Sequence, residues 1–185
     1  MQFLPMFLMA ISVAGEREKG TIEQLIVTPL SGLEILAGKM LTYMMIGFVD
    51  AVLPLLAAVY LFGLAIKGNL MLLGLFIVIF TAASLSLGIL SSVFAKNQLQ
   101  AVQQVLPAIY VSIFLSGVFY PLESIPNFLR PISYFIPLTY MNHALRTIII
   151  KGAGIEVVLV DLMALALYTI AIMSLAIFLF KKKLE

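Results

Sequence analysis

The chain consists of long apolar runs separated by shorter polar segments. A helix needs about 20 apolar residues to cross the hydrocarbon core of a bilayer, and four of the runs reach that length. A fifth run, at the start of the chain, is too short to cross. The pattern therefore predicts an all-α, polytopic membrane protein with one partial N-terminal helix at residues 2–14 and four full spans at residues 40–62, 70–94, 99–119 and 157–180.

The partial helix has no basic start and no small-residue cleavage site, so it does not match a signal peptide. We interpret it as the end of a helix whose beginning is missing. The chain is then expected to be the C-terminal part of a longer protein or a shortened paralogue, and residues 1–185 are expected to form a single transmembrane domain.

Composition supports the membrane class. The chain is 63% hydrophobic and 11% charged, whereas soluble domains have about 45–50% apolar and about 25% charged residues. A transmembrane β-barrel would show short alternating segments instead. The chain has no cysteine and one histidine, His143, so no metal site is expected. The basic residues are scattered, which gives no indication of nucleic-acid binding.

The first polar segment, residues 15–39, begins with a cluster of charged residues. Thr21 and Gln24 fit a capping box that opens a short helix, and Pro29 ends that helix. A second capping box, Ser31 to Glu34, opens the helix that leads into the next span. Two interpretations remain: an interfacial helix that rests on lipid headgroups, or a docking helix for a cytoplasmic protein.

The second polar segment, residues 120–156, is divided by prolines into two apolar pieces near 124–135 and 139–150, each too short to cross. A re-entrant helical hairpin or two interfacial helices fit this pattern. The aromatic residues of the segment would lie at headgroup level.

Lysine and arginine positions predict the orientation. Placing the C-terminus in the cytoplasm puts the lysines of residues 181–183 there, together with Arg17, Lys19, Lys39 and Lys96. The opposite side then carries fewer basic residues, namely Lys67, Arg130, Arg146 and Lys151. The charged cluster of residues 15–39 is therefore expected to be cytoplasmic.

Asp50 lies near the centre of its span, where a carboxylate costs about 2.5–3.5 kcal/mol and is expected to face protein or water rather than lipid. Pro54, four residues later, lacks the N–H group that would bond the Asp50 carbonyl, which weakens the helix there. Asp50 is either a gate or substrate contact, or a packing residue satisfied by a neighbouring hydroxyl group.

Nucleotide hydrolysis by this chain is not expected. The nearest fragment to a phosphate-binding loop, Gly38-Lys39-Met40, lacks both the leading glycine and the Ser or Thr after the lysine. No Ser/His/Asp set stands at recognisable motif spacing either.

Two motifs together carry a resemblance to a known family. The first is Gly15-Glu16-Arg17-Glu18-Lys19-Gly20-Thr21-Ile22-Glu23-Gln24-Leu25, followed by Thr28-Pro29-Leu30-Ser31, Glu34 and Gly38-Lys39. The second is Ser116-Gly117, Tyr120-Pro121-Leu122-Glu123-Ser124-Ile125-Pro126, Pro137-Leu138-Thr139-Tyr140, Leu145-Arg146 and Lys151-Gly152. With both motifs in this order and separated by two spans, the chain resembles ABC-2 type transporter permeases of the multidrug-exporter branch over essentially its whole length.

The resemblance implies a homodimeric or heterodimeric permease in the cell membrane, without a nucleotide site of its own. ATP and Mg²⁺ would be bound by a partner, an ABC ATPase subunit that docks on a cytoplasmic coupling helix. It also implies re-entrant helices on the outer side. The family's first span, and the extracellular domain that this branch often inserts before the second, have no counterpart here.

Carried onto this sequence, the resemblance assigns residues 15–39 to coupling and residues 120–156 to the re-entrant segment. The coupling residues are expected to be Glu16, Arg17, Glu18, Gly20, Thr21, Glu23, Leu25 and Pro29. The re-entrant segment is expected to depend on Pro121, Glu123, Pro126, Pro137, Tyr140 and Arg146. Asp50 and Pro54 are candidates for the transport pathway.

The predicted function is therefore that of the membrane-spanning subunit of an ATP-binding cassette exporter, moving a hydrophobic or amphiphilic, drug-like or lipid-like substrate out of the cytoplasm. The alternative is a truncated or non-transporting membrane protein that acts as an assembly partner. Co-purification with an ATPase whose turnover the chain changes would distinguish the two.

Overall fold

The computed structural model describes residues 3–20 and 32–184, and this part of the chain is helical with connecting loops and contains no strand. The elements are α1 (Phe3–Glu18), α3 (Gly32–Phe62), α4 (Leu70–Phe94), α5 (Gln98–Leu115), the 3₁₀ turn η1 (Leu122–Ser124), α6 (Arg130–Ser133), α7 (Pro137–Ile149) and α8 (Ile155–Leu184).

Within the described residues, four helices are long and apolar enough to cross a membrane, as the hydrophobic pattern predicts. They are Glu34–Phe62, Leu70–Phe94, Gln98–Leu115 and Ile155–Phe180. The chain is thus an all-α, multi-pass membrane protein.

Two predicted boundaries were wrong. Helix α1 continues through the charged residues to Glu18, beyond the predicted end at residue 14. Helix α3 begins at Gly32, within the predicted second capping box, so helix occupies both ends of the polar connection 15–39. Polar residues there are compatible with helix because a helix that leaves the bilayer keeps its internal hydrogen bonds in water. The third span ends at Leu115 instead of residue 119, since Gly117 adopts a φ of 78°, which ends a right-handed helix.

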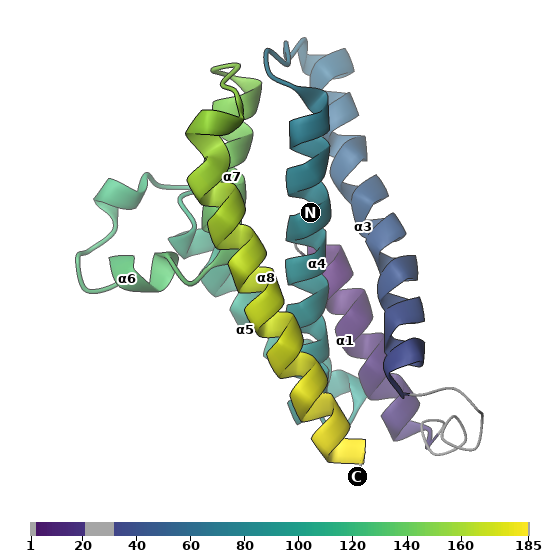
Figure 1. Ribbon diagram of the computed structural model, residues 1–185. Helices are drawn as coiled ribbons and strands as arrows, with labels where there is room; N and C mark the ends of the chain where they lie inside the picture. Colours follow the sequence, from purple (N-terminus) through teal and green to yellow (C-terminus); the bar gives the residue numbers. More distant parts are fainter. Residues whose placement is uncertain (1–2, 21–31, 185) are drawn as a thin grey trace.

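Helix α4 lies at the centre of the bundle, with α8 and α3 on either side in Figure 1. In its most apolar window 56% of the residues are buried, against 11% for α3 and for α8. This position explains why the span at 70–94 carries no charged residue, since a charge inside it would have no route to water.

Small residues allow the close approaches between helices. A methyl group at Gly88 of α4 would lie 2.5 Å from the carbonyl oxygen of Met6 in α1. A methyl group at Gly47 of α3 would lie 2.5 Å from Thr81 Cγ2 in α4 and 2.7 Å from Pro5 Cγ in α1. Helix α3 therefore crosses α1 and α4 at Gly47, and Ala51, one turn later, still packs in the core with residues of α4.

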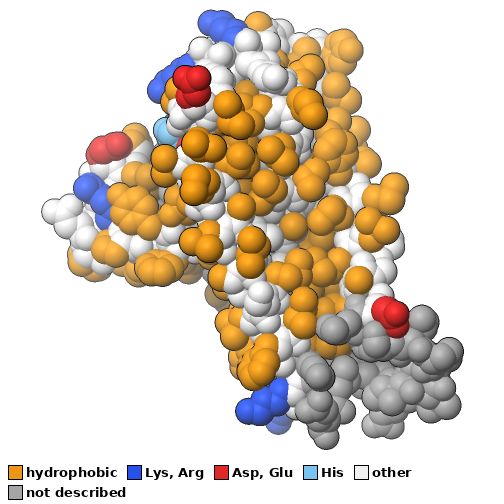
Figure 2. Space-filling view, viewed as in Figure 1, with side chains coloured by type: hydrophobic (Ala, Val, Ile, Leu, Met, Phe, Trp, Pro, Cys, Tyr) orange, Lys and Arg blue, Asp and Glu red, His pale blue; other side chains and the backbone are white. Residues whose placement is uncertain are grey.

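The loops between the long helices lie at the two ends of the bundle. The end of α1, the start of α3, the turn between α4 and α5 and the C-terminus share one end, called here the C-terminal end (Figure 1). The loops at residues 63–69 and 150–154 share the opposite end. Figure 2 shows charged side chains at both ends and on a lateral projection, while the surface between is mainly apolar. This distribution fits a bundle that spans a bilayer.

The lateral projection, residues 116–136, is called the side arm. It connects α5 to α7, contains η1 and α6, and extends sideways from the bundle (Figure 1). Three prolines of the segment 120–156 stand near the starts of elements: Pro121 precedes η1, Pro131 lies in the first turn of α6 and Pro137 begins α7. Of the apolar piece predicted near 124–135, only Arg130–Ser133 is α-helical. The apolar piece predicted at 139–150 corresponds to α7.

Candidate functional site

The last turn of α1 carries three consecutive charged residues, and each of them contacts a different helix. Glu16 contacts α3, Arg17 contacts α4 and Glu18 contacts α5. Successive residues of a helix point about 100° apart, so a run of three charges at the end of a helix surrounded by others can reach three neighbours. We call this group the helix junction.

Arg17 caps the C-terminal end of α4. Its guanidinium Nη1 donates to the carbonyl oxygens of Ala95 at 2.9 Å, Val93 at 3.3 Å and Ser92 at 3.4 Å. The last four carbonyl groups of a helix have no partner within the helix, and they carry the negative end of its dipole. Burial lowers the pKa of Arg17, but an arginine remains protonated at any pH at which proteins are folded.

Glu18 acts at the N-terminal end of α5. Its Oε2 accepts a hydrogen bond from the backbone N–H of Gln98 at 3.1 Å. Asn97 completes the cap, since its Oδ1 accepts from the N–H of Gln100 at 2.8 Å. One turn of α1 therefore terminates α4 and starts α5, which holds the connection between these two helices in place.

Glu16 forms an ion pair with Lys39 of α3, and Lys39 Nζ also donates to Ser12 Oγ at 2.7 Å. Both charged side chains are partly buried, so water screens this pair less than a surface pair. The ion pair joins the end of α1 to the start of α3, the two helices that lead into and out of residues 21–31.

The structure thus brings Glu16, Arg17 and Glu18 together, and Gly20 follows with a φ of 66° that suits glycine. The other expected coupling residues, Thr21, Glu23, Leu25 and Pro29, lie outside the described residues, as do the first capping box and Ser31 of the second. Lys39 and Ser12 complete the junction. The sequence placed Lys39 in the motif, but nothing in the hydrophobic pattern indicated Ser12.

Asp50 lies half-buried on α3, three residues beyond the crossing at Gly47. Together with Leu53 and three further apolar residues of α3 it lines an open pocket of about 360 Å³, which Leu4 of α1 closes on one side. Pro54 is exposed, and α3 continues through it as one helix. Leu4 also lines a second pocket between α1 and α5, so both pockets flank the start of α1.

Helix α7 forms hydrogen bonds with both ends of the side arm, its outgoing limb near residues 116–121 and its returning limb near residue 134. Asn142 Nδ2 donates to the carbonyl of Ser116 at 3.4 Å, and an Arg146 guanidinium nitrogen donates to that of Val118 at 3.3 Å. The returning limb is held by Tyr140, whose hydroxyl donates to the carbonyl of Tyr134 at 2.8 Å. The expected re-entrant residues Tyr140 and Arg146 therefore share one role.

Within the arm itself, Arg130 Nη2 donates to the backbone carbonyl of Glu123 at 2.9 Å, and the carbonyl of Pro126 accepts from the N–H groups of Leu129 and Arg130. These bonds close the projecting loop on itself. They involve the backbone of Glu123 and Pro126, and the Glu123 side chain extends from η1 at the surface.

Sequence reasoning missed Asp161, seven residues into α8. Its Oδ2 lies 2.7 Å from Nδ1 of His143 on α7, and its side chain is mostly buried while the imidazole is exposed. Its negative charge also contributes to a raised pKa of Tyr140, after the larger effect of burial and before that of Tyr134. An acidic residue within an apolar span was the available signal, the same one that indicated Asp50.

No group of three or more His, Cys, Asp or Glu residues suited to hold a metal ion occurs within residues 3–20 and 32–184. The contacts of the helix junction are an ion pair and hydrogen bonds between helices. Such a site transmits or resists movement of the helices that it joins.

Comparison with known proteins gives the family. The model of the ABC-2 type transporter family matches residues 1–150. The probable multidrug ABC transporter permease YbhS of Escherichia coli is 34% identical over 154 residues, which cover 83% of this chain and 41% of that protein. The probable multidrug ABC transporter permease YbhR of the same organism is 29% identical over 178 residues, covering 96% of this chain and 48% of that protein.

A more distant similarity is to ABC transporter G family member 20 of Dictyostelium discoideum, 28% identical over 147 residues, which are 80% of this chain and 20% of that protein. No solved structure matches the chain. The chain spans less than half the length of these relatives. The family match over most of the chain, together with its four spans, shows that the chain belongs to the ABC-2 type transporter family.

Proposed function

We propose that this chain forms the membrane-spanning permease part of an ATP-binding cassette exporter. It would move a hydrophobic or amphiphilic, drug-like or lipid-like substrate out of the cytoplasm, with ATP and Mg²⁺ bound by a separate ATPase subunit. Family membership supports this proposal, as does the similarity to two bacterial proteins described as probable multidrug ABC transporter permeases. It would act in the cell membrane as a homodimer or heterodimer with a second permease subunit, with its C-terminus in the cytoplasm.

The helix junction is the observation that carries the coupling part of the proposal. An ATPase docked on residues 15–39 would push or pull on the end of α1 and the start of α3. The end of α1 is bonded to α4 and α5 through Arg17 and Glu18, so it would move with the bundle. Helix α3 is held by the Glu16–Lys39 pair, the crossing at Gly47 and a few buried residues such as Leu36 and Ala51, and we expect it to move relative to the bundle.

A charge-swap experiment tests this mechanism. The chain is reconstituted with an ABC ATPase from its own genome, and ATP hydrolysis and substrate efflux are measured for Glu16→Lys, for Lys39→Glu and for the two changes together. We expect both single variants to hydrolyse ATP without proportionate efflux, because like charges then meet at the junction. The double variant restores the ion pair and should recover coupling.

Glu156→Lys, in the first turn of α8 at the opposite end, makes the same change of charge and should leave coupling intact. If the double variant stays uncoupled, Glu16 contacts the ATPase directly, and the junction is not what transmits the movement. If the chain neither binds the ATPase nor changes its turnover, the export function itself is wrong and a role in assembly is favoured.

A further inference from the structure

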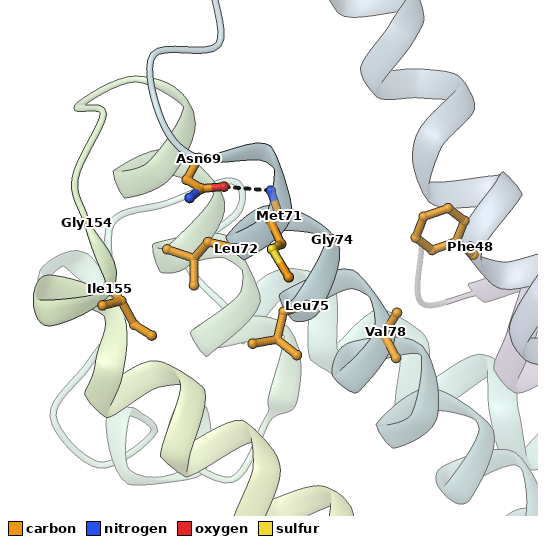
Figure 3. Close-up of a pocket in the computed structure, with 9 residues that line it drawn as sticks. All are labelled: Phe48, Asn69, Met71, Leu72, Gly74, Leu75, Val78, Gly154 and Ile155. Carbon is orange, nitrogen blue, oxygen red and sulfur yellow. Dashed lines mark hydrogen bonds between the residues drawn. The ribbon is translucent and has the colours of Figure 1, made fainter.

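A groove on the lateral face of the bundle is not used by the coupling mechanism. It lies between α4, the start of α8 and Phe48 of α3, and has a volume of about 590 Å³. Figure 3 shows Met71, Leu72, Leu75 and Val78 in order along α4, with Ile155 on one side and Phe48 of α3 on the other. Asn69 and Gly154 lie at its upper rim, at the end of the bundle opposite the C-terminus.

The depth of this groove matches one leaflet of a bilayer. From Asn69 to Val78 a helix rises about 14 Å at about 1.5 Å per residue. Half of the roughly 30 Å hydrocarbon core is about 15 Å. The groove therefore extends from the polar boundary to near the middle of the membrane, and its lining below the rim is apolar.

Gly74 indicates that the groove is an open space rather than a packing surface. Glycine inside a helix costs about 0.5–1 kcal/mol relative to alanine, so it usually serves a close contact. Gly47 and Gly88 serve such contacts, but a methyl group built at Gly74 meets no atom within 4 Å. At Gly74 the missing side chain leaves room on the groove floor.

The two loops that supply the rim residues Asn69 and Gly154 carry one lysine each. Lys67 and Lys151 belong to the two loops at this end, and the loops are bonded together through the N–H of Lys67 and the carbonyl of Ile149 at 3.1 Å. A methyl group at Gly152 would lie 3.0 Å from Lys67 Cβ, so the backbones at both lysines are neighbours. Both side chains are exposed, as is Glu156 in the first turn of α8, which leaves one net positive charge at the rim.

We propose that this groove binds one acyl chain of an anionic phospholipid, whose phosphate group contacts Lys67 and Lys151. An apolar groove one leaflet deep fits an acyl chain, and the positive rim at its polar end fits a negatively charged headgroup. The lipid would fill the space between Phe48 of α3, the exposed face of α4 and the start of α8. This site is separate from the proposed export pathway.

The chain contains no tryptophan, which allows a direct test. Phe48→Trp places a single fluorophore at the groove wall, and the full chain is reconstituted in phosphatidylcholine vesicles. Brominated phosphatidylglycerol, which is anionic, is compared with brominated phosphatidylcholine as a quencher. We expect half-quenching at a roughly fivefold lower mole fraction of the anionic lipid, as one net charge near a membrane surface contributes about 1 kcal/mol.

Three variants give the controls. Met163→Trp places the fluorophore on the exposed face of α8 outside the groove, and there both lipids should quench equally. Replacing Lys67 and Lys151 by Gln in the Phe48→Trp chain should remove the preference for the anionic lipid. Gly74→Leu should reduce quenching by both lipids without loss of helical content, because it fills the groove and favours the helix.

Equal quenching of Phe48→Trp by the two lipids, or a preference that survives the lysine changes, would overturn the proposal. Weaker quenching at Phe48→Trp than at Met163→Trp by either lipid would also overturn it, since it would show that protein rather than lipid covers the groove. Circular dichroism of each variant confirms that the fold is intact.

Discussion

At the scale of single residues, the charged cluster of the first motif serves the protein's own helices. Arg17 satisfies carbonyl groups at the end of α4, and Glu18 satisfies an N–H group at the start of α5. Backbone groups at helix ends that leave the bilayer need such partners, and charged donors and acceptors form the stronger hydrogen bonds. A motif that was predicted to face a partner is thus, in its first half, an internal connection.

Removing the Arg17 cap should destabilise the protein. We expect Arg17→Gln to lower the free energy of unfolding by about 2 kcal/mol, the usual contribution of hydrogen bonds to a charged group. The free energy of unfolding of Arg17→Lys should lie between those of the parent chain and Arg17→Gln, because lysine keeps the charge but not the planar arrangement of donors. Thermal unfolding in detergent measures both, with Lys96→Gln, an exposed lysine at the same end, as the control. Equal stability of Arg17→Gln and the parent chain would show that the cap is unimportant.

The raised pKa of Tyr140 predicts a loss of stability at alkaline pH. A group whose pKa is higher in the folded state stabilises the fold below its unfolded pKa of about 10, and this contribution is lost as the pH rises through the folded pKa. Tyr140→Phe removes the titrating hydroxyl group. We therefore expect its stability to fall less steeply above pH 10 than that of the parent, measured by unfolding between about pH 8 and pH 11.

Tyr120→Phe, an exposed tyrosine of the side arm, provides the matched control for this pH series. Parallel curves for Tyr140→Phe and the parent would mean that burial and the charge of Asp161 do not act on Tyr140 in the folded protein. The neutral-pH offset between the curves separately reports the hydrogen bond to the carbonyl of Tyr134.

At the scale of elements, the sequence predicted the spans well because hydrophobic length is a direct requirement of the bilayer. The span at 70–94 was predicted to the residue, since polar residues and helix caps stand at both of its ends. The C-terminal end of α1 was not predicted, because the hydrophobic pattern assigns charged residues to connections between helices. Arg17 and Glu18 are nevertheless helical, and their side chains contact other helices. Such contacts connect residues about 80 positions apart, and no local pattern contains them.

The position of the side arm could not be predicted from local sequence either. Prolines stand near the starts of η1, α6 and α7. The hydrogen bonds that hold the arm, however, come from α7, which the sequence predicted only as a short apolar piece. Asn142 and Arg146 hold the outgoing limb, and Tyr140 holds the returning limb. The position of the arm is therefore a property of α7 and not of the arm's own sequence.

We expect Arg146→Ala to loosen the first limb of the arm. Loss of its hydrogen bond to Val118 should raise amide exchange at residues 116–121 roughly fivefold, which corresponds to about 1 kcal/mol. Hydrogen exchange with mass spectrometry resolves this segment. Arg130→Ala is the matched control, because its bond to Glu123 lies within the arm and should affect residues 123–130 instead. Unchanged exchange at 116–121 would show that Asn142 and packing suffice to hold the limb.

At the scale of the whole molecule, the helices divide into a well-packed group and a loosely held one. Helices α1, α4 and α5 share bonds at the junction, and α4 packs along α8. Helix α3 crosses this group at Gly47, so movement about the crossing would open or close the space beside Asp50. Only 11% of the residues in the apolar window of α3 are buried, so a pivot about the crossing would disturb few of its packing contacts.

This arrangement makes Asp50 the residue to test for transport. Asp50→Asn keeps the size of the side chain and removes its charge, so in the assembled exporter it should change efflux rate or substrate preference severalfold. Removing a carboxylate from mid-membrane saves about 2.5–3.5 kcal/mol on insertion scales, so folding should be unaffected or improved. Asp161→Asn is the matched control, because this second carboxylate of the spans contacts His143 and lies away from α3. If Asp50→Asn transports normally and is only more stable, Asp50 is a packing residue and the substrate passes elsewhere.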